Sequence, residues 1–567
     1  MRVNRRLRAV RTVMAAWLVL AATLLWCGGS ASAKPAYALI EGSGSSWAAN
    51  AVQQWISDVS SNGIKVVFGS TGSAQGRIDF ANRTTDFGVS DIGYQGVDPA
   101  TGASDTSQGR AYAYLPIVAG GTALPYNIVV NGKRVVNLRL SGSTIAKIFT
   151  QKITNWDDAA ITADNNGHAL PSLPIIPVQH SEGSGSSYQF TRYLSKEFPS
   201  IWTTGASEYF PPAGGSAVAE NGSDGVINFL TSGAANGAIG FDEYSYALGA
   251  GLPVAKVLNS NGYYTLPNQY NVAVALTQAQ INLNKSSPDY LLQDLDNVYV
   301  YNDPRVYPMS SYSYAIIPTA SNDARMTSSK RQTLADYLDY SVCQGQSEMG
   351  HIGYSPLPIN LVQASFDQVS KLHTADPSVD ISALRVTSCQ NPTFIAGHPS
   401  ENYLAKVAPY PPSCDKQGAG PCVGNGNTGQ SNPNSNGSVP TTGNNSGGSN
   451  GGSNGGGGSS GGSGGTGGSN GSGGSNGSNG STGGTSGNGA KVKNSASAVN
   501  YNPTTGQLGN GGTGDSALLG ASPSDASKLL ADGQSNNTNL ALALVIGGLV
   551  LGLRAVPAIV GTRLTKR

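Results

Sequence analysis

Apolar runs alternate with amphipathic stretches along the first two thirds of the chain. Two of these runs lead into the same sequence, Glu-Gly-Ser-Gly-Ser-Ser, at 41–46 and again at 182–187, and an aromatic residue follows each copy. Behind each copy, apolar residues recur at helical spacing over 48–56 and 188–198. The pattern therefore predicts a strand, a Gly/Ser turn and a helix at both places.

Turns of this composition can hold an anion. Glycines let the backbone approach a ligand, and serines supply hydroxyls and helix caps. The N–H groups of the first helical turn point outward and attract negative charge. A third such loop, 69–76, follows the apolar run 64–68, and a short strand at 86–91 ends in a carboxylate. A single Gly/Ser turn is more often only a capped turn, but three in matched contexts favour an anion site.

The remaining patterns continue the alternation of strands and helices. We expect a β-rich segment at 115–130 broken by Gly120-Gly121, a helix at 143–149, a polar turn at 153–158, a capped helix at 221–230, a buried strand at 237–241, a β-rich segment at 306–317 and a helix at 330–343. This order predicts an α/β fold in which ligands bind at the carboxyl ends of strands.

Composition divides the chain into a folded part and a long linker. Of the 567 residues, 34 are Lys or Arg and 33 are Asp or Glu, a balance that argues against a nucleic-acid partner. Much of the excess glycine lies in 424–489, which cannot bury a core. We expect a domain at 34–410 and a disordered linker at 411–538, which spans about 60 Å on average.

Both ends of the chain have membrane-targeting features. Arginines precede an apolar stretch that ends at Ala31-Ser-Ala33, so 1–33 is predicted to be a cleaved signal peptide. Residues 539–561 are predicted to form a transmembrane helix, interrupted by Arg554, and the basic tail 562–567 would lie in the cytoplasm. The domain would then stand outside the cell. The alternative is a sorting or surface-associated tail that does not span.

The cysteines fit an exported protein. Cys343, Cys389, Cys414 and Cys422 remain after cleavage, and an even number outside the cell favours disulfides. Spacing favours Cys343 with Cys389 and Cys414 with Cys422, although connectivity stays open. The chain has no CxxC motif and its five histidines are scattered, so we predict neither a metal nor a cofactor.

Taken together, the motifs over 38–363 resemble the substrate-binding protein of the bacterial ABC phosphate-uptake system, the PstS family. The resemblance rests on their order and spacing: Gly42-Ser-Gly-Ser-Ser-Trp47, Gly72-Ser73, Asp86-Phe-Gly-Val-Ser-Asp91, Lys152-Ile-Thr-Asn-Trp-Asp-Asp158, Gly183-Ser-Gly-Ser186 and Gly237-Ala-Ile-Gly-Phe-Asp-Glu-Tyr244. It implies a periplasmic-binding-protein fold of type II. Two α/β lobes, about 37–122 with 312–410 and about 126–308, would be joined by crossings near 121–127 and 308–315, with phosphate in the cleft between them.

The resemblance also implies the ligand residues: Ser45, Ser46, Trp47, Ser73, Asp91, His180, Ser184, Gly185 and Ser186. Asp91 matches the carboxylate that accepts a proton from the bound oxyanion. A carboxylate only accepts, so it favours protonated phosphate and repels fully ionised sulfate. The alternative interpretation is that Asp91 only caps a helix.

One position departs from the family. His180 stands where the family has an arginine, four residues before the serine of the second-lobe loop. Arginine is a rigid fork that is always charged, whereas histidine is only partly charged at neutral pH. Either phosphate binds more weakly and with pH dependence, or Arg192 or Lys152 substitutes, or the ligand differs. His180 could also be an ordinary surface turn residue.

These observations lead to one main hypothesis and two alternatives. The main hypothesis is a membrane-tethered protein that captures phosphate and passes it to an ABC permease or a sensor, and not an enzyme. A secreted phosphatase or hydrolase is the first alternative, but the folded part has no GxSxG motif. The second is a surface adhesin that kept the fold and lost the ligand.

Overall fold

The computed structural model describes most of the predicted domain and little of the chain beyond it. The described residues are 36–98, 101–212, 214–398, 401–422, 500–502 and 507–509. The predicted signal peptide 1–33, most of the linker 411–538, the predicted transmembrane helix 539–561 and the tail 562–567 lie outside them. Within the described ranges, no helix is both long and apolar enough to cross a bilayer.

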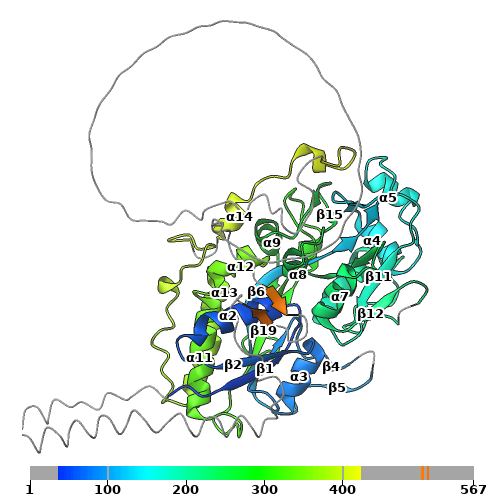
Figure 1. Ribbon diagram of the computed structural model, residues 1–567. Coiled ribbons are helices and arrows are strands. Elements are labelled where there is room, and N and C mark those ends of the chain that lie inside the picture. Colours follow the sequence, from blue (N-terminus) through cyan, green and yellow to red (C-terminus); the bar gives the residue numbers. More distant parts are fainter. Residues whose placement is uncertain are drawn as a thin grey trace, which may run out of the picture. The chain divides into compact units, whose positions relative to one another are not determined.

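A six-stranded sheet organises the first half of the fold (Figure 1), in the order β14, β6, β19, β3, β1, β2. Its strands are β1 (Ile40–Gly44), β2 (Val66–Ser70), β3 (Phe87–Ser90), β6 (Tyr112–Ala123), β14 (Asp242–Glu243) and β19 (Ser310–Pro318). Strand β1 pairs in parallel with both β2 and β3. The carboxyl ends of these three strands therefore meet at one edge of the sheet.

Helices connect and cover these strands. Parallel neighbours need crossover connections, which α2 (Ala49–Ser60) and α3 (Ser73–Ala81) supply. In α2, Val52, Trp55 and Val59 recur at helical spacing and are buried in the core. Three later helices complete this half: α11 (Ser328–Val342), α12 (Gln346–Ile352) and α13 (Ile359–Ala375). Helix α11 starts where the Thr327 side chain accepts the backbone N–H of Lys330.

The expected break at Gly120-Gly121 is wrong, because β6 runs through both glycines. Gly120 pairs with Ser311 and Gly121 with Ser310 of β19. A Cβ on Gly120 would lie 2.7 Å from the Trp47 ring. The glycines are needed for close packing of neighbouring side chains on an uninterrupted strand, and not for a turn.

A four-stranded sheet organises the second half, in the order β12, β11, β13, β7. Its strands are β7 (Tyr126–Asn127), β11 (Ile176–His180), β12 (Val218–Glu220) and β13 (Ala238–Gly240). Strand β11 is parallel to β12 and β13. The helices of this half are α4 (Gly142–Phe149), α5 (Ala159–Asp164), α6 (Gly185–Glu197), α7 (Gly222–Thr231) and α8 (Tyr244–Gly249).

Further short elements complete the described part of the chain. A three-stranded sheet contains β10 (Arg139–Leu140), β15 (Lys256–Leu258) and β16 (Tyr264–Thr265), and paired strands are β4 (Gly96–Val97) with β5 (Ser104–Asp105), β8 (Val129–Val130) with β9 (Lys133–Arg134), β17 (Gln280–Ile281) with β18 (Gln293–Asp294), and β20 (Asn500–Asn502) with β21 (Gln507–Gly509). The remaining helices are α9 (Gln269–Leu276), α10 (Asp296–Tyr299), η1 (Val386–Ser388), α14 (Tyr403–Val407) and η2 (Ser413–Asp415).

The chain passes between the two sheets at adjacent positions. After β6 ends at Ala123, β7 begins at Tyr126 in the other sheet. The return passage enters β19 at Ser310, which pairs with Gly121 of β6. Strand β14 also follows β13 directly and pairs with the end of β6. The two halves are thus joined by neighbouring antiparallel strands, an arrangement that permits a hinge.

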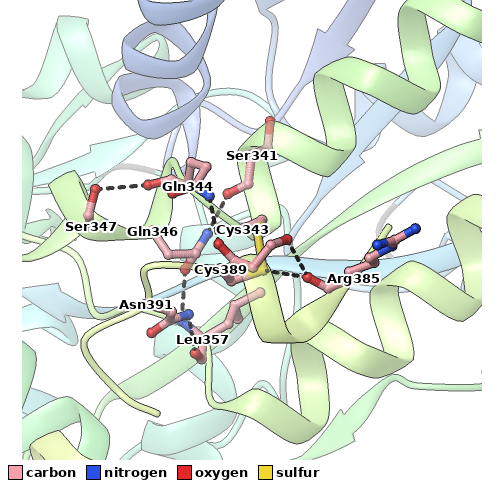
Figure 2. Close-up of a disulfide and its surroundings, with 10 residues drawn as sticks. Ser341, Cys343, Gln344, Gln346, Ser347, Leu357, Arg385, Cys389 and Asn391 are labelled. Carbon is pink, nitrogen blue, oxygen red and sulfur yellow. Dashed lines mark hydrogen bonds between the residues drawn. A yellow bond between two sulfur atoms is a disulfide. The ribbon is translucent and has the colours of Figure 1, made fainter. Parts of the chain in front are cut away.

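Two disulfides cross-link the C-terminal part of the folded region. Cys343 at the end of α11 is bonded to Cys389, and Figure 2 shows Gln346, Leu357 and Asn391 beside this bond. Gln346 donates to the Ser341 carbonyl at 2.7 Å and accepts from the Leu357 N–H at 2.8 Å. The pairing is the one that spacing favours.

The second disulfide, Cys414–Cys422, lies beyond the predicted domain end at 410. Arg139 of β10 donates to the carbonyls of Cys414 and Ala419, and Lys256 of β15 pairs with Asp415 at 2.6 Å. The folded region therefore extends at least to residue 422, into the segment that composition assigned to the linker.

Candidate functional site

Three parallel strands bring the first set of predicted residues together. Ser45 follows β1, Ser73 begins α3 after β2, and Asp91 follows β3. The Ser45 hydroxyl lies 2.8 Å from each Asp91 oxygen, and Ser73 Oγ donates to Asp91 Oδ2 at 3.1 Å. The carboxylate thus sits between two hydroxyls at the start of two helices.

Asp91 is almost completely buried, with 3% of its surface exposed. Burial raises the pKa of its carboxyl above the ordinary value, and hydrogen bonds from Ser313, Ser45 and Ser73 only partly offset this effect. A buried carboxylate with several hydroxyl donors is strongly oriented, and it gains from a ligand that brings a proton.

The second-half loop packs directly against this carboxylate. Ser184 stands at the N-cap position of α6, and its N–H donates to the Glu208 carbonyl at 2.9 Å. A Cβ on Gly185 would lie 2.3 Å from Asp91 Oδ2 and 2.5 Å from Ser73 Oγ. Only glycine allows the N-terminus of α6 to approach so closely. The Ser186 hydroxyl is buried and has no hydrogen-bond partner in the described part of the chain.

Helix α7 supplies a contact that the sequence analysis did not assign to the site. The backbone N–H and the hydroxyl of Ser223 both approach Ser46 Oγ, at 3.3 and 3.1 Å. The capped helix was predicted at 221–230, and it follows β12 in the same strand, turn and helix pattern as the other loops. That repeated pattern was the available signal.

Trp47 plays a different role from its serine neighbours. Its indole is buried and packs edge-on against Tyr354, with ring centroids 5.7 Å apart. The Trp47 carbonyl accepts from the Tyr354 hydroxyl at 2.6 Å. The side chain therefore belongs to the core and fixes the backbone of the loop.

His180 ends β11 and is not a surface turn residue, because only 2% of it is exposed. Its Nδ1 lies 2.9 Å from Glu182 Oε1, and its ring packs on Phe241 at 5.2 Å between centroids. Burial disfavours the charged ring, but the Glu182 carboxylate outweighs burial, so the pKa of His180 is raised. Glu182 also accepts from the Gly222 N–H at 2.9 Å, which ties this pair to the start of α7.

Asp242 is a further buried carboxyl near this pair. It follows β13, which is parallel to β11, so its backbone and that of His180 emerge at the same sheet edge. Burial raises the pKa of Asp242 to about 7, against the opposing charge of His180 and a hydrogen bond from Ser223. The sequence analysis did not assign a role to Asp242.

The cations considered as replacements for the family arginine are engaged elsewhere. Arg192 pairs with Asp294 and Asp296 at 2.8 Å each. Lys152 donates to the Ile201 carbonyl at 3.3 Å. In this arrangement the cationic side chain beside the second-half loop is His180, which is held by Glu182.

Arg77 of α3 links the two halves beside the site. Its guanidinium contacts Asp105 at 2.8 Å and Glu208 of the second half at 2.6 Å, and all three side chains are buried. Burial would lower the pKa of Arg77, but Glu208 and Asp105 outweigh burial and raise it. The guanidinium is therefore charged, and it is already paired with two carboxylates. Across the described ranges, no group of three His, Cys, Asp or Glu residues is placed to hold a metal ion.

Known proteins that are similar to this chain identify its family. The family model described as "PBP superfamily domain" matches residues 29–344. Phosphate-binding protein PstS 2 of Mycobacterium tuberculosis is 32% identical over 340 residues, which are 59% of this chain and 85% of that protein. The chain belongs to the PstS family of the PBP superfamily. The family resemblance drawn from the loop motifs is confirmed.

Other relatives of this PstS-family chain cover a similar region. Phosphate-binding protein PstS of Xylella fastidiosa (strain Temecula1) is 30% identical over 332 residues, 57% of this chain and 83% of that protein. Among solved structures, a high-affinity periplasmic phosphate-binding protein bound with phosphate at pH 8.5 has 20% identity and a TM-score of 0.45. The match covers 62% of this chain and 98% of the chain in that structure.

Proposed function

We propose that this protein captures inorganic phosphate between its two halves and delivers it to an ABC permease. The observation that carries the proposal is Asp91, buried between the hydroxyls of Ser45 and Ser73 and against the N-terminus of α6. Helix N-termini stabilise an anion, and the carboxylate accepts the proton that distinguishes hydrogen phosphate from sulfate. Membership of the PstS family supports the same ligand.

The ligand residues that we propose are Ser45, Ser46, Ser73, Asp91, Ser184, Gly185 and Ser186, with the backbone of Trp47. The buried and unpartnered hydroxyl of Ser186 supports its assignment, because such a group gains from a ligand acceptor. We assign His180 to a supporting cationic role beside the ligand, with its charge favoured by Glu182.

The test is isothermal titration calorimetry of the purified full chain with phosphate, arsenate and sulfate. We expect phosphate and arsenate to bind with similar affinity, because both carry a proton at neutral pH, and sulfate to bind at least tenfold more weakly. Equal affinity for sulfate, or no heat with phosphate, would overturn the proposal. Turnover of a chromogenic phosphate ester would instead favour a hydrolase.

We further propose that the protein is exported and tethered at the outer face of the membrane by 539–561. The two disulfides support an oxidising compartment. Deleting 539–567 should release folded protein into the medium. If the truncated protein stays with the membrane fraction, the N-terminal segment is the anchor and the proposed tether is wrong.

A further inference from the structure

A cavity of about 410 Å³ lies at the start of β6, away from the residues assigned to phosphate. This volume is within the range of small-molecule sites, roughly 300–1,000 Å³. The lining combines β6, the segment before β18, and α13: Ser107, Gly109, Arg110, Ala111, Tyr112, Ala113, Tyr114, Lys285, Ser287, Pro288, Tyr290, Thr319, Gln368 and Lys371. None of these residues belongs to the proposed phosphate site.

A buried amide in this lining lacks a partner. Gln368 of α13 is only 3% exposed, yet its Oε1 accepts no hydrogen bond from the described residues. Buried amide oxygens are almost always bonded, since leaving one unpaired is unfavourable. A hydroxyl or amine of a molecule in the cavity would satisfy it.

Two lysines of the lining also lack counter-ions. Neither Lys285 nor Lys371 forms a salt bridge with any described carboxylate. The pKa of Lys371 is lowered by burial and by the charge of Lys285, so the two ammonium groups repel each other. An anion between them would relieve that repulsion.

The other charged groups nearby do not neutralise the lysines. Arg110 is satisfied by Asp323 at 2.8 Å and by two backbone carbonyls. Asp289 lies in the same segment as Lys285 and faces the tyrosines of the lining: a Cβ on Gly93 would be 3.5 Å from its Oδ1 and 3.4 Å from the Tyr114 hydroxyl, and its charge adds to burial in raising the pKa of Tyr112. Asp289 forms no salt bridge with Lys285, Lys371 or another described cation, and burial raises its pKa.

Tyrosines form the third part of the lining. Tyr112 and Tyr114 lie on the same face of β6, with ring centroids 5.1 Å apart, and Tyr112 is half-buried. Aromatic walls with a few placed polar groups are typical of small-molecule sites, and a tyrosine ring can stack on the apolar face of a ring-shaped ligand. The cavity therefore offers an aromatic wall, two cations and one free acceptor.

We propose that this cavity is a second binding site, which takes a hydroxylated ring molecule bearing one acid group, of the size of a phosphorylated or carboxylated monosaccharide. Lys285 and Lys371 would hold the acid group, Gln368 would accept from a ring hydroxyl, and Tyr112 would contact the ring. This site is independent of phosphate capture in the cleft.

Titration of the full chain in phosphate-free buffer with glucose 6-phosphate, glucuronate and glucose tests the proposal. We expect at least one of the two acids to bind and neutral glucose to bind at least tenfold more weakly. The Lys285→Gln/Lys371→Gln variant should lose at least tenfold in affinity for the acid, and Gln368→Leu should lose less. Failure of both acids to bind the unaltered chain would overturn the proposal.

Two controls separate the cavity from the cleft. Ser45→Ala removes a hydroxyl from the proposed phosphate site and should leave the affinity for the acid unchanged. The exposed Lys65→Gln should change neither the affinity for phosphate nor the affinity for the acid. Loss of acid binding in Ser45→Ala, with full binding in the double lysine variant, would place the acid in the cleft and contradict the second site. Thermal unfolding of each variant checks that it is folded.

Discussion

At the scale of single residues, the chemistry of Asp91 depends on what surrounds it. Its two oxygens face the hydroxyls of Ser45 and Ser73, which can donate to the carboxylate. A carboxylate in this position can take a proton from a ligand but cannot donate one while ionised. In the proposed site, discrimination between phosphate and sulfate would come from repulsion of an anion that has no proton.

Asp91→Asn removes that repulsion and keeps the shape of the side chain. We expect phosphate to bind about tenfold more weakly and sulfate to bind more tightly, so the ratio of the two affinities falls. Calorimetry with both anions measures this ratio, and the exposed Asp157→Asn serves as a charge-matched control. An unchanged ratio would falsify the placement of Asp91 at the ligand.

His180 carries a second prediction, which concerns pH. Its raised pKa means that its charged pair with Glu182 is fully present below about 6.5, the ordinary histidine value, and is lost as pH rises through the raised value. His180→Arg keeps the charge at every pH. The variant should therefore bind phosphate about as tightly as the natural chain at pH 6 and about fivefold more tightly at pH 8.5. That change corresponds to roughly 1 kcal/mol of binding free energy, the difference between a charged and a neutral hydrogen bond.

The ratio between the two proteins isolates this effect, because phosphate itself ionises equally in both experiments. His351→Arg adds the same charge at an exposed position and should leave both affinities unchanged. Identical affinities of His180→Arg and the natural chain at both pH values would mean that His180 has no electrostatic role in binding.

Sequence patterns could identify residues that directly follow a strand, but not residues that meet them from the other half. Ser45, Ser73 and Asp91 each follow a strand of one parallel set, so their convergence can be read from local pattern. Ser223 meets Ser46 only because two separate sheets pack together, and Glu182 reaches the start of α7 across neighbouring strands of the second sheet. No local pattern contains that packing. Trp47 was placed in the right loop, and only the structure shows its ring inside the core.

At the scale of elements, the start of α6 controls how closely the halves approach. Helical spacing placed the amphipathic pattern at 188–198, whereas α6 begins at Gly185. The pattern could not locate this first turn, because Gly185 and the serines after it have no apolar side chains to mark a helix. Yet this turn is the one that touches Asp91.

Gly185→Ala tests that contact. Its Cβ would lie 2.3 Å from Asp91 Oδ2, so α6 must retreat from the first half. We expect at least a tenfold loss of phosphate affinity with little change in thermal stability, because the residue can stay helical after the retreat. Gly249→Ala is a matched control, since a Cβ there meets no atom within 4 Å. Full affinity in Gly185→Ala would show that α6 does not close on the ligand.

At the scale of the whole folded region, three links join the two halves in addition to the contacts of the site loops. The sheet strands β6 and β19 form the first, and the pair of Arg77 with Glu208 forms the second. The third is the segment 389–422, which begins at the Cys343–Cys389 bond on α11 and ends on β10 and β15. The first could be predicted from the family resemblance. The disulfides of the third link follow from cysteine spacing, but its contacts with β10 and β15 could not be predicted, and neither could the second link, because no motif marks these partners.

Glu208→Gln weakens the second link. Removing one partner of a buried ion pair costs about 3–5 kcal/mol, and less here because Arg77 keeps Asp105. We expect the phosphate-free protein to populate more open arrangements, seen as a larger radius of gyration in X-ray scattering that phosphate reverses. The exposed Glu348→Gln should leave the radius unchanged. An unaltered radius in Glu208→Gln would show that the ion pair does not hold the halves together.

The third link can be tested by comparing the two disulfides. The Cys414–Cys422 loop presents its carbonyls to Arg139 and its Asp415 to Lys256, so it fastens the segment to the second half. Without that bond the loop gains freedom, the halves can separate further, and closure on a ligand costs more entropy. Cys414→Ala/Cys422→Ala should therefore weaken phosphate binding severalfold, by calorimetry, with a modest fall in thermal stability.

Cys343→Ala/Cys389→Ala is the matched comparison, because both of its ends belong to the first half. Opening that longer loop should lower the free energy of unfolding by about 2–4 kcal/mol. It should leave phosphate affinity nearly unchanged while the protein is folded, because the contacts of 414–422 with Arg139 and Lys256 persist. If both double variants lose affinity equally, the segment acts only through general stability. If only the first loses affinity, the end of the folded region limits how far the cleft opens.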